Sequence, residues 1–272
     1  MLNQIFTLPD LKTLDFTNAY AMQGISHLLL SLMQRSGAFT TQTARSPETQ
    51  KLISIGKRWI KGLEQNIALI PPHDVLRAIS CYDMVYRICW QGPNDSFYNK
   101  QFSRAFEAYI HGDKQVSETE LMRVISSGLR RRDKFYFDRP LSWNCMTIDS
   151  WIKQFFQDKF KALPIAEKCA RLSIIISDDL FAYFGSKQDE PKITMAKEGL
   201  KEAISYDGND AETLMEIIFL IRNSRRLVKR TERIRKLELK AMNALTQCPE
   251  LHETDRKAFA LDLDFYQQEG LI

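Results

Sequence analysis

Apolar residues recur at steps of three and four along most of the chain, which is the period of an α-helix that buries one face. Proline, glycine and runs of serine and threonine interrupt this pattern and divide it into separate segments. Ser46 before Pro47 predicts the start of one helix, and the capping box formed by Ser117 and Glu120 predicts another. In the first half of the chain we predict helices over roughly 14–36, 47–68, 74–91, 98–109 and 117–125.

Helical spacing resumes at about Asp149 and continues almost to the end of the chain. Here the predicted helices cover roughly 149–160, 165–184, 191–205, 211–247 and 254–268. No two segments alternate as paired strands would. The sequence therefore predicts an all-α protein of about ten helices.

The stretch 130–148 lacks a helical stripe and mixes charged with aromatic residues. We interpret it as a linker or a small extended element between two packed helical halves. This divides the chain into an N-terminal helical subdomain, 1–129, and a C-terminal helical subdomain, 130–272.

The longest predicted helix, 211–247, contains neither glycine nor proline. Its first half is apolar nearly all round, whereas its second half is apolar on one side only. We expect one long basic amphipathic helix whose first half is buried and whose second half packs by one face.

The distribution of charge adds a functional hypothesis, because the net positive charge of the chain is concentrated on that predicted helix. From Arg222 to Lys240 the chain holds nine basic residues and two acidic ones, Glu232 and Glu238, which give a net charge of +7. The whole chain carries +4, so the remaining residues together carry −3.

Six of these basic residues step by 4, 3, 4, 3 and 4 positions. They are Arg222, Arg226, Lys229, Arg233, Lys236 and Lys240. On a continuous helix they would occupy a wedge of roughly 80° and a stripe about 27 Å long. A row of guanidinium and ammonium groups can neutralise successive phosphates, so we predict binding of a polyanion, most plausibly nucleic acid.

A second basic cluster precedes aromatic residues at 135–137, a combination that can follow a single strand by phosphate contacts and base stacking. Its candidate binding residues are Arg130, Arg131 and Arg132. If both basic clusters share one face, the nucleic-acid interpretation gains support. The alternative is a linker whose aromatic residues anchor it to the helical core.

Two other classes of function remain open. The basic stripe can be a solvated helix face, with Glu232 and Lys236 as an i,i+4 pair, or the site of an acidic protein partner on a helical adaptor. It can also pair within the molecule with the acidic remainder of the chain. A helical enzyme would need a pocket that gathers Asp178, Asp179 or His252 with other polar groups. We predict no membrane partner, because the apolar face of the helix is needed for the core.

Common catalytic and cofactor motifs are absent from the sequence, including phosphate-binding glycine loops, the nucleophile elbow and the H-E-x-x-H zinc motif. We predict neither a metal nor a cofactor, and the sequence favours a binding protein over an enzyme. The five cysteines are scattered and the first residues do not resemble a signal peptide, which predicts a cytoplasmic location.

Overall fold

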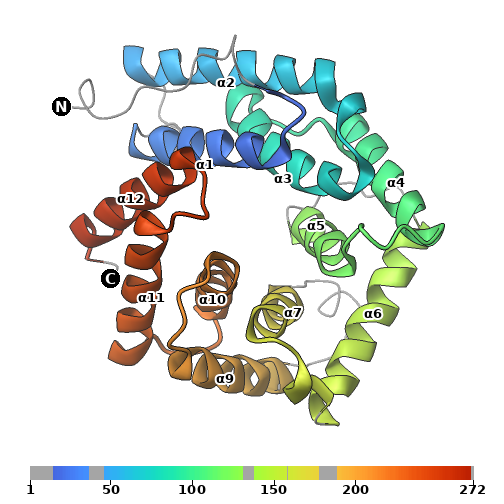
Figure 1. Cartoon of the computed structure of the whole chain (residues 1–272), viewed down its shortest axis with the longest axis vertical. Coiled ribbons are helices and arrows are strands. Elements are labelled where there is room, and N and C mark those ends of the chain that lie inside the picture. The colour runs from blue at the N-terminus through green and yellow to red at the C-terminus, as the bar shows by residue number, and fades with distance from the viewer. Residues whose placement is uncertain (1–14, 37–45, 131–137, 158, 178–188, 271–272) are drawn as a thin grey trace. The chain divides into compact units, whose positions relative to one another are not determined.

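The computed structural model describes residues 15–36, 46–130, 138–157, 159–177 and 189–270, and this part of the chain is all-α (Figure 1). It contains eleven α-helices and no strand, which confirms the predicted fold class. The α-helices are α1 (Ala19–Arg35), α2 (Pro47–Asn66), α3 (Pro72–Trp90), α4 (Asp95–Ile110), α5 (Glu118–Arg130), α6 (Asp138–Phe156), α7 (Ile165–Ser177), α9 (Asp189–Ser205), α10 (Ala211–Ser224), α11 (Glu232–Gln247) and α12 (Glu253–Gln268). Short 3₁₀ helices cover Ile67–Leu69 and Lys159–Ala162.

Side chains cap several helices at the starts that the sequence signals. The Ser46 hydroxyl accepts a hydrogen bond from the Thr49 amide at 3.2 Å, and Pro47 opens α2. Asp210 accepts from the Thr213 amide at 2.8 Å at the start of α10. Each cap satisfies an amide that lacks a partner in the first turn of a helix.

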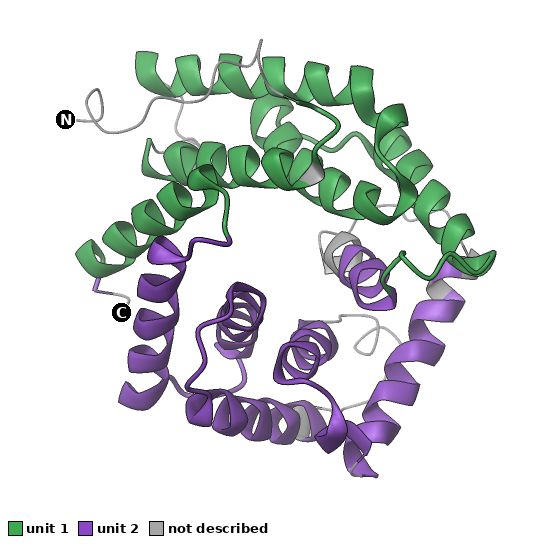
Figure 2. Cartoon of the chain, viewed as in Figure 1, with its two compact units in different colours: residues 1–117, 251–269 green, residues 118–250, 270–272 purple. Residues whose placement is uncertain are grey.

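Contacts divide the chain into two compact units (Figure 2). Unit 1 comprises residues 1–117 with 251–269, and unit 2 comprises 118–250 with 270–272. These are groupings by contact, and the subdomains 1–129 and 130–272 stay a prediction. None of the helices in the described part of the chain is long and apolar enough to cross a membrane.

The predicted linker 130–148 is wrong over its second part, because α6 begins at Asp138. Residues 131–137 lie outside the described residues. The inner face of α6 places polar Asn144 and Thr147 beside buried Ile148 and Trp151, so polar residues interrupt the apolar stripe that would have revealed the helix. Pro140 lies in the first turn, where proline is tolerated.

The core of unit 2 is built around α7 and α10, which lie side by side (Figure 1). Apolar residues of α6, α9 and α11 complete the same cluster. From the basic stretch, Ile234 and Leu237 are buried in this cluster, and Leu227 and Val228 pack against it. The core therefore determines the path of the chain between α10 and α11.

The single long helix predicted over 211–247 is wrong: α10 ends at Ser224 and α11 begins at Glu232. The amides of Leu227 and Val228 both donate to the Ser224 carbonyl, at 2.9 Å each, and so form a turn. Thr231 then caps α11 by accepting a hydrogen bond from the Ile234 amide at 3.3 Å. The bend places Leu227 and Val228 against the core of unit 2, and their burial favours it.

In unit 1, α12 packs directly on α1. A small apolar cluster of Leu28, Leu32, Ala258 and Leu261 joins the two helices. Gly24 allows the close approach, because a Cβ at this position would lie 2.3 Å from the Thr254 hydroxyl oxygen.

Polar contacts continue this α1–α12 interface. Ser31 donates to Asp262 at 2.7 Å, and Arg35 donates to Asp264 at 2.7 Å. The His27 ring nitrogens lie 3.4 Å from Asp262 and 3.8 Å from Asp255. Burial favours the neutral imidazole, but the hydrogen bonds and charges of the two carboxylates outweigh it and raise the pKa of His27 to about 9.

The raised pKa makes the stability of unit 1 depend on pH. An unfolded histidine titrates near 6.5, so the contribution of His27 is complete below that pH and is lost as the pH rises through about 9. We expect a loss on the order of 3 kcal/mol in the free energy of unfolding over this window. Urea unfolding of the wild type and of His27→Gln at a series of pH values measures it. A loss of equal size in His27→Gln would show that other groups cause it.

Candidate polyanion-binding surface

The basic stretch is organised around one buried carboxylate. Glu238, in the second turn of α11, is fully buried and faces three arginines. Arg225 Nη2 donates to Glu238 Oε1 at 2.9 Å, and Arg230 pairs with the other carboxylate oxygen, Oε2. Arg222 Nε lies 3.7 Å from Oε1. A carboxylate so far from water is stabilised by the opposite charges and hydrogen bonds around it.

The bend between α10 and α11 is a condition of this pairing. Arg222 and Glu238 are separated by 16 residues, which in one straight helix would place their backbones about 24 Å apart. The turn folds α11 back so that the two side chains meet. Arg222, which we predicted on an outward-facing stripe, is therefore turned toward Glu238 instead, and the six-residue stripe is not continuous.

The other predicted residues remain at the surface. Arg226 and Lys229 are exposed in the turn, and Arg233, Lys236 and Lys240 are exposed on α11. The three on α11 step by three and four positions, so they form a stripe about 10 Å long. Glu232 and Lys236 do form the expected i,i+4 pair, at 3.8 Å, between side chains that are 69% and 75% exposed. An exposed pair at this distance neutralises little charge.

The charge that reaches the surface is thus almost entirely positive. Of the nine basic residues between 222 and 240, seven are exposed, whereas Arg222 and Arg230 are half-buried. Of the two acidic residues, only Glu232 is exposed. We call residues 222–240 the basic segment. It presents cations from the turn and from α11, rather than from one helix face.

The second predicted cluster falls largely outside the described residues. Arg130 is the last residue of α5, and its side chain is among those not described. Arg131 and Arg132 lie outside the described residues altogether. Whether they share a surface with the basic segment therefore stays a prediction.

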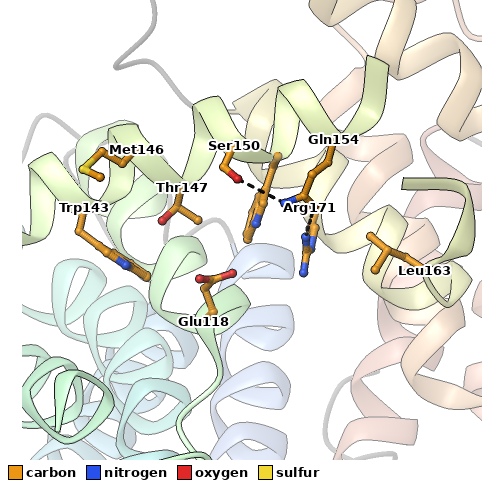
Figure 3. A pocket seen from close by; sticks show the side chains of 9 residues that line it. Glu118, Trp143, Met146, Thr147, Ser150, Gln154, Leu163 and Arg171 are labelled. Atoms are coloured by element: carbon orange, nitrogen blue, oxygen red, sulfur yellow. Dashed lines mark hydrogen bonds between the residues drawn. The ribbon is translucent and has the colours of Figure 1, made fainter. Parts of the chain in front are cut away.

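An open pocket of about 460 Å³ lies beside α6 in unit 2 (Figure 3). Its lining is mixed aromatic, aliphatic and polar: Glu118, Trp143, Met146, Thr147, Ser150, Trp151, Gln154, Leu163 and Arg171. Gln154 accepts a hydrogen bond from Arg171 at 3.3 Å and donates one to Ser150 at 3.3 Å (Figure 3). The Arg171 guanidinium also donates to Glu167 at 2.6 Å and lies 4.7 Å from the Trp151 ring centroid. No residue that we predicted for function lines this pocket.

Of the side chains considered for catalysis, the structure describes only His252, which has a structural role. His252 caps α12 by accepting from the Thr254 amide at 3.3 Å. Asp178 and Asp179 lie outside the described residues.

Metal and thiol chemistry can be assessed for the same part of the chain. No group of three or more His, Cys, Asp and Glu side chains in the described ranges could hold a metal ion. Burial, with Glu216 and Glu202 adding to it, raises the pKa of the Cys169 thiol to about 12, so this cysteine is protonated and unreactive at neutral pH.

No protein-family model, curated protein or solved structure matches this chain. Its function must therefore be inferred from its own residues, of which the basic segment forms the most distinctive arrangement.

Glu238→Gln tests the role of the buried carboxylate in stability. Removing its charge leaves three converging guanidiniums without their counterion, so we expect the free energy of unfolding to fall by about 3 to 5 kcal/mol. Urea unfolding at neutral pH measures the change. The matched control is Glu232→Gln, on the same helix but exposed, for which we expect a change within about 0.5 kcal/mol. Equal effects of the two substitutions would show that Glu238 has no special role.

Proposed function

We propose that this protein binds a polyanion, most plausibly the phosphate backbone of a nucleic acid, through the basic segment of unit 2. The observation that carries the proposal is that seven basic residues between 222 and 240 are exposed beside a single exposed acidic residue. Cations that neutralise phosphates release counterions, and this release drives association without any sequence preference.

The state of the exposed cations supports the proposal. No hydrogen bond or ion pair to another described residue engages the side chains of Arg226, Lys229, Arg233 or Lys240. Such side chains can contact a ligand without first breaking an internal contact. Binding of these cations to phosphates weakens steeply as the salt concentration rises, because each contact releases counterions and this release is less favourable at high salt.

A helical adaptor remains the alternative, and one observation favours it. The pocket beside α6 has Met146 in its lining, with 73% of that residue exposed. Exposed apolar side chains at an open pocket are common at protein-binding sites. In this alternative the basic segment is either solvated or contacts an acidic protein partner, and nucleic acid is not bound.

A fourfold charge-neutral variant tests the proposal. We expect Arg226→Gln, Lys229→Gln, Arg233→Gln and Lys236→Gln together to raise the Kd for a labelled DNA duplex about tenfold or more at low salt. The slope of log K against log salt should also fall in magnitude, by up to about 3.6 if all four contact phosphates. Fluorescence anisotropy at several salt concentrations, with duplex DNA and single-stranded RNA, measures both effects.

The matched control removes four exposed basic charges from unit 1, by the substitutions Lys51→Gln, Arg58→Gln, Lys61→Gln and Lys100→Gln. It changes net charge equally, so we expect a much smaller effect on binding. Equal weakening by the two variants would mean that only total charge matters. If the wild-type protein binds neither DNA nor RNA at low salt, the proposal is wrong and the adaptor alternative gains.

A further inference from the structure

Two acidic residues are buried in the described part of the chain, and they are paired in different ways. Asp83 accepts two hydrogen bonds, at 3.0 Å each, from Arg87 one turn along the same helix. Glu238 instead pairs with arginines that lie 8, 13 and 16 positions before it in the chain. The Asp83 pair is therefore local to α3, whereas Glu238 links separate segments.

The two oxygens of Glu238 pair with arginines near opposite ends of the turn between α10 and α11. Oε1 accepts from Arg225, the first residue after α10, and Oε2 pairs with Arg230, just before the cap of α11. The carboxylate itself has no solvent exposure, so surrounding side chains hold it in place. Arg225 and Arg230, at the two ends of the turn, therefore both pair with one buried carboxylate on α11.

The exposed cations of the turn are adjacent in sequence to these two arginines. Arg226 follows Arg225, and Lys229 precedes Arg230. Because the pairings with Glu238 restrain residues 225 and 230, they also restrain the backbone from which Arg226 and Lys229 project. Restraint before binding reduces the entropy that a site loses when it orders on its ligand.

We propose that Glu238 is a positioning residue for polyanion binding: its buried carboxylate holds the turn 225–230 in the conformation that presents Arg226 and Lys229 to phosphates. This inference rests on the proposed function. Glu238 itself contacts no ligand, because it is fully buried.

The proposal makes a prediction opposite in sign to that of simple electrostatics. A negative charge beside a polyanion site repels the ligand, so on charge alone its removal should tighten binding. If Glu238 positions the turn, its removal should weaken binding, even though the protein becomes more positive.

The first experiment compares Glu238→Gln with Glu232→Gln, which make the same change in net charge on the same helix. The probe is a fluorescein-labelled 20-base-pair DNA duplex, and fluorescence anisotropy is followed over a range of salt concentrations. We expect Glu232→Gln to bind as tightly as the wild type or more tightly, and Glu238→Gln to bind about fivefold more weakly. Glu238→Gln should also show a shallower salt dependence, because fewer phosphates are contacted at once. Circular dichroism confirms that each variant is folded at the temperature used.

A second pair of variants conserves charge and avoids a buried unpaired group. Lysine keeps the charge of arginine but lacks its rigid fork of donors. Arg230→Lys should therefore weaken the pairing with Glu238, whereas Arg58→Lys makes the same change at an exposed cation of unit 1, outside the basic segment, that pairs with no described residue. We expect Arg230→Lys to weaken duplex binding several-fold and Arg58→Lys to change it by less than about twofold. This pair tests the inference even if Glu238→Gln does not fold.

The outcomes separate the inference from the proposed function. If the wild type binds the duplex but Glu238→Gln binds as tightly as Glu232→Gln, or Arg230→Lys behaves like Arg58→Lys, the positioning role is wrong and the proposed function stands. If the wild type does not bind DNA or RNA at low salt, both are wrong. Weaker binding by Glu238→Gln and Arg230→Lys, with folded proteins and unchanged controls, supports both.

Discussion

The pairing of Glu238 with three arginines is the interaction on which the arrangement of the basic segment depends. A buried carboxylate is costly unless cations and hydrogen bonds compensate it, and here the cations come from the end of α10 and from the turn. They can reach Glu238 only because the chain bends after Ser224. The bend in turn brings Leu227 and Val228 onto the core of unit 2. Burial of apolar side chains and neutralisation of Glu238 thus favour the same bend.

The sequence predicts the helical class and most helix positions because apolar periodicity and capping residues are local signals. Ser46 and Asp210 cap helices near their predicted starts, each through an amide three residues further along. The signal fails for α6, where Asn144 and Thr147 are buried among apolar residues. It also fails to reveal the partners of His27, since Asp255 and Asp262 lie more than 220 positions away. Contacts between residues so far apart in the chain produce no periodic pattern in the sequence.

The break between α10 and α11 could be predicted only in part. Basic residues at steps of three and four are as compatible with one continuous helix as with two helices joined by a turn. The charge pattern therefore gave no indication of the turn. Two signals were available: Thr231 is a favourable N-cap, and Glu238 lies on the apolar face of α11 beside Ile234 and Leu237. An acid on an apolar face needs a cation, and the three cations that pair with Glu238 all lie before the helix. The identity of those cations depends on tertiary packing that no local pattern encodes.

The composition of the basic segment also limits the kind of contact that it can make. Residues 222–247 include no aromatic residue, so this segment offers no ring on which a base could stack. Its turn and its 10 Å stripe on α11 present cations alone, which suit phosphates and carry little information about base identity. Binding through this segment would therefore depend on salt and on backbone charge rather than on sequence. Sequence preference would have to come from another part of the chain.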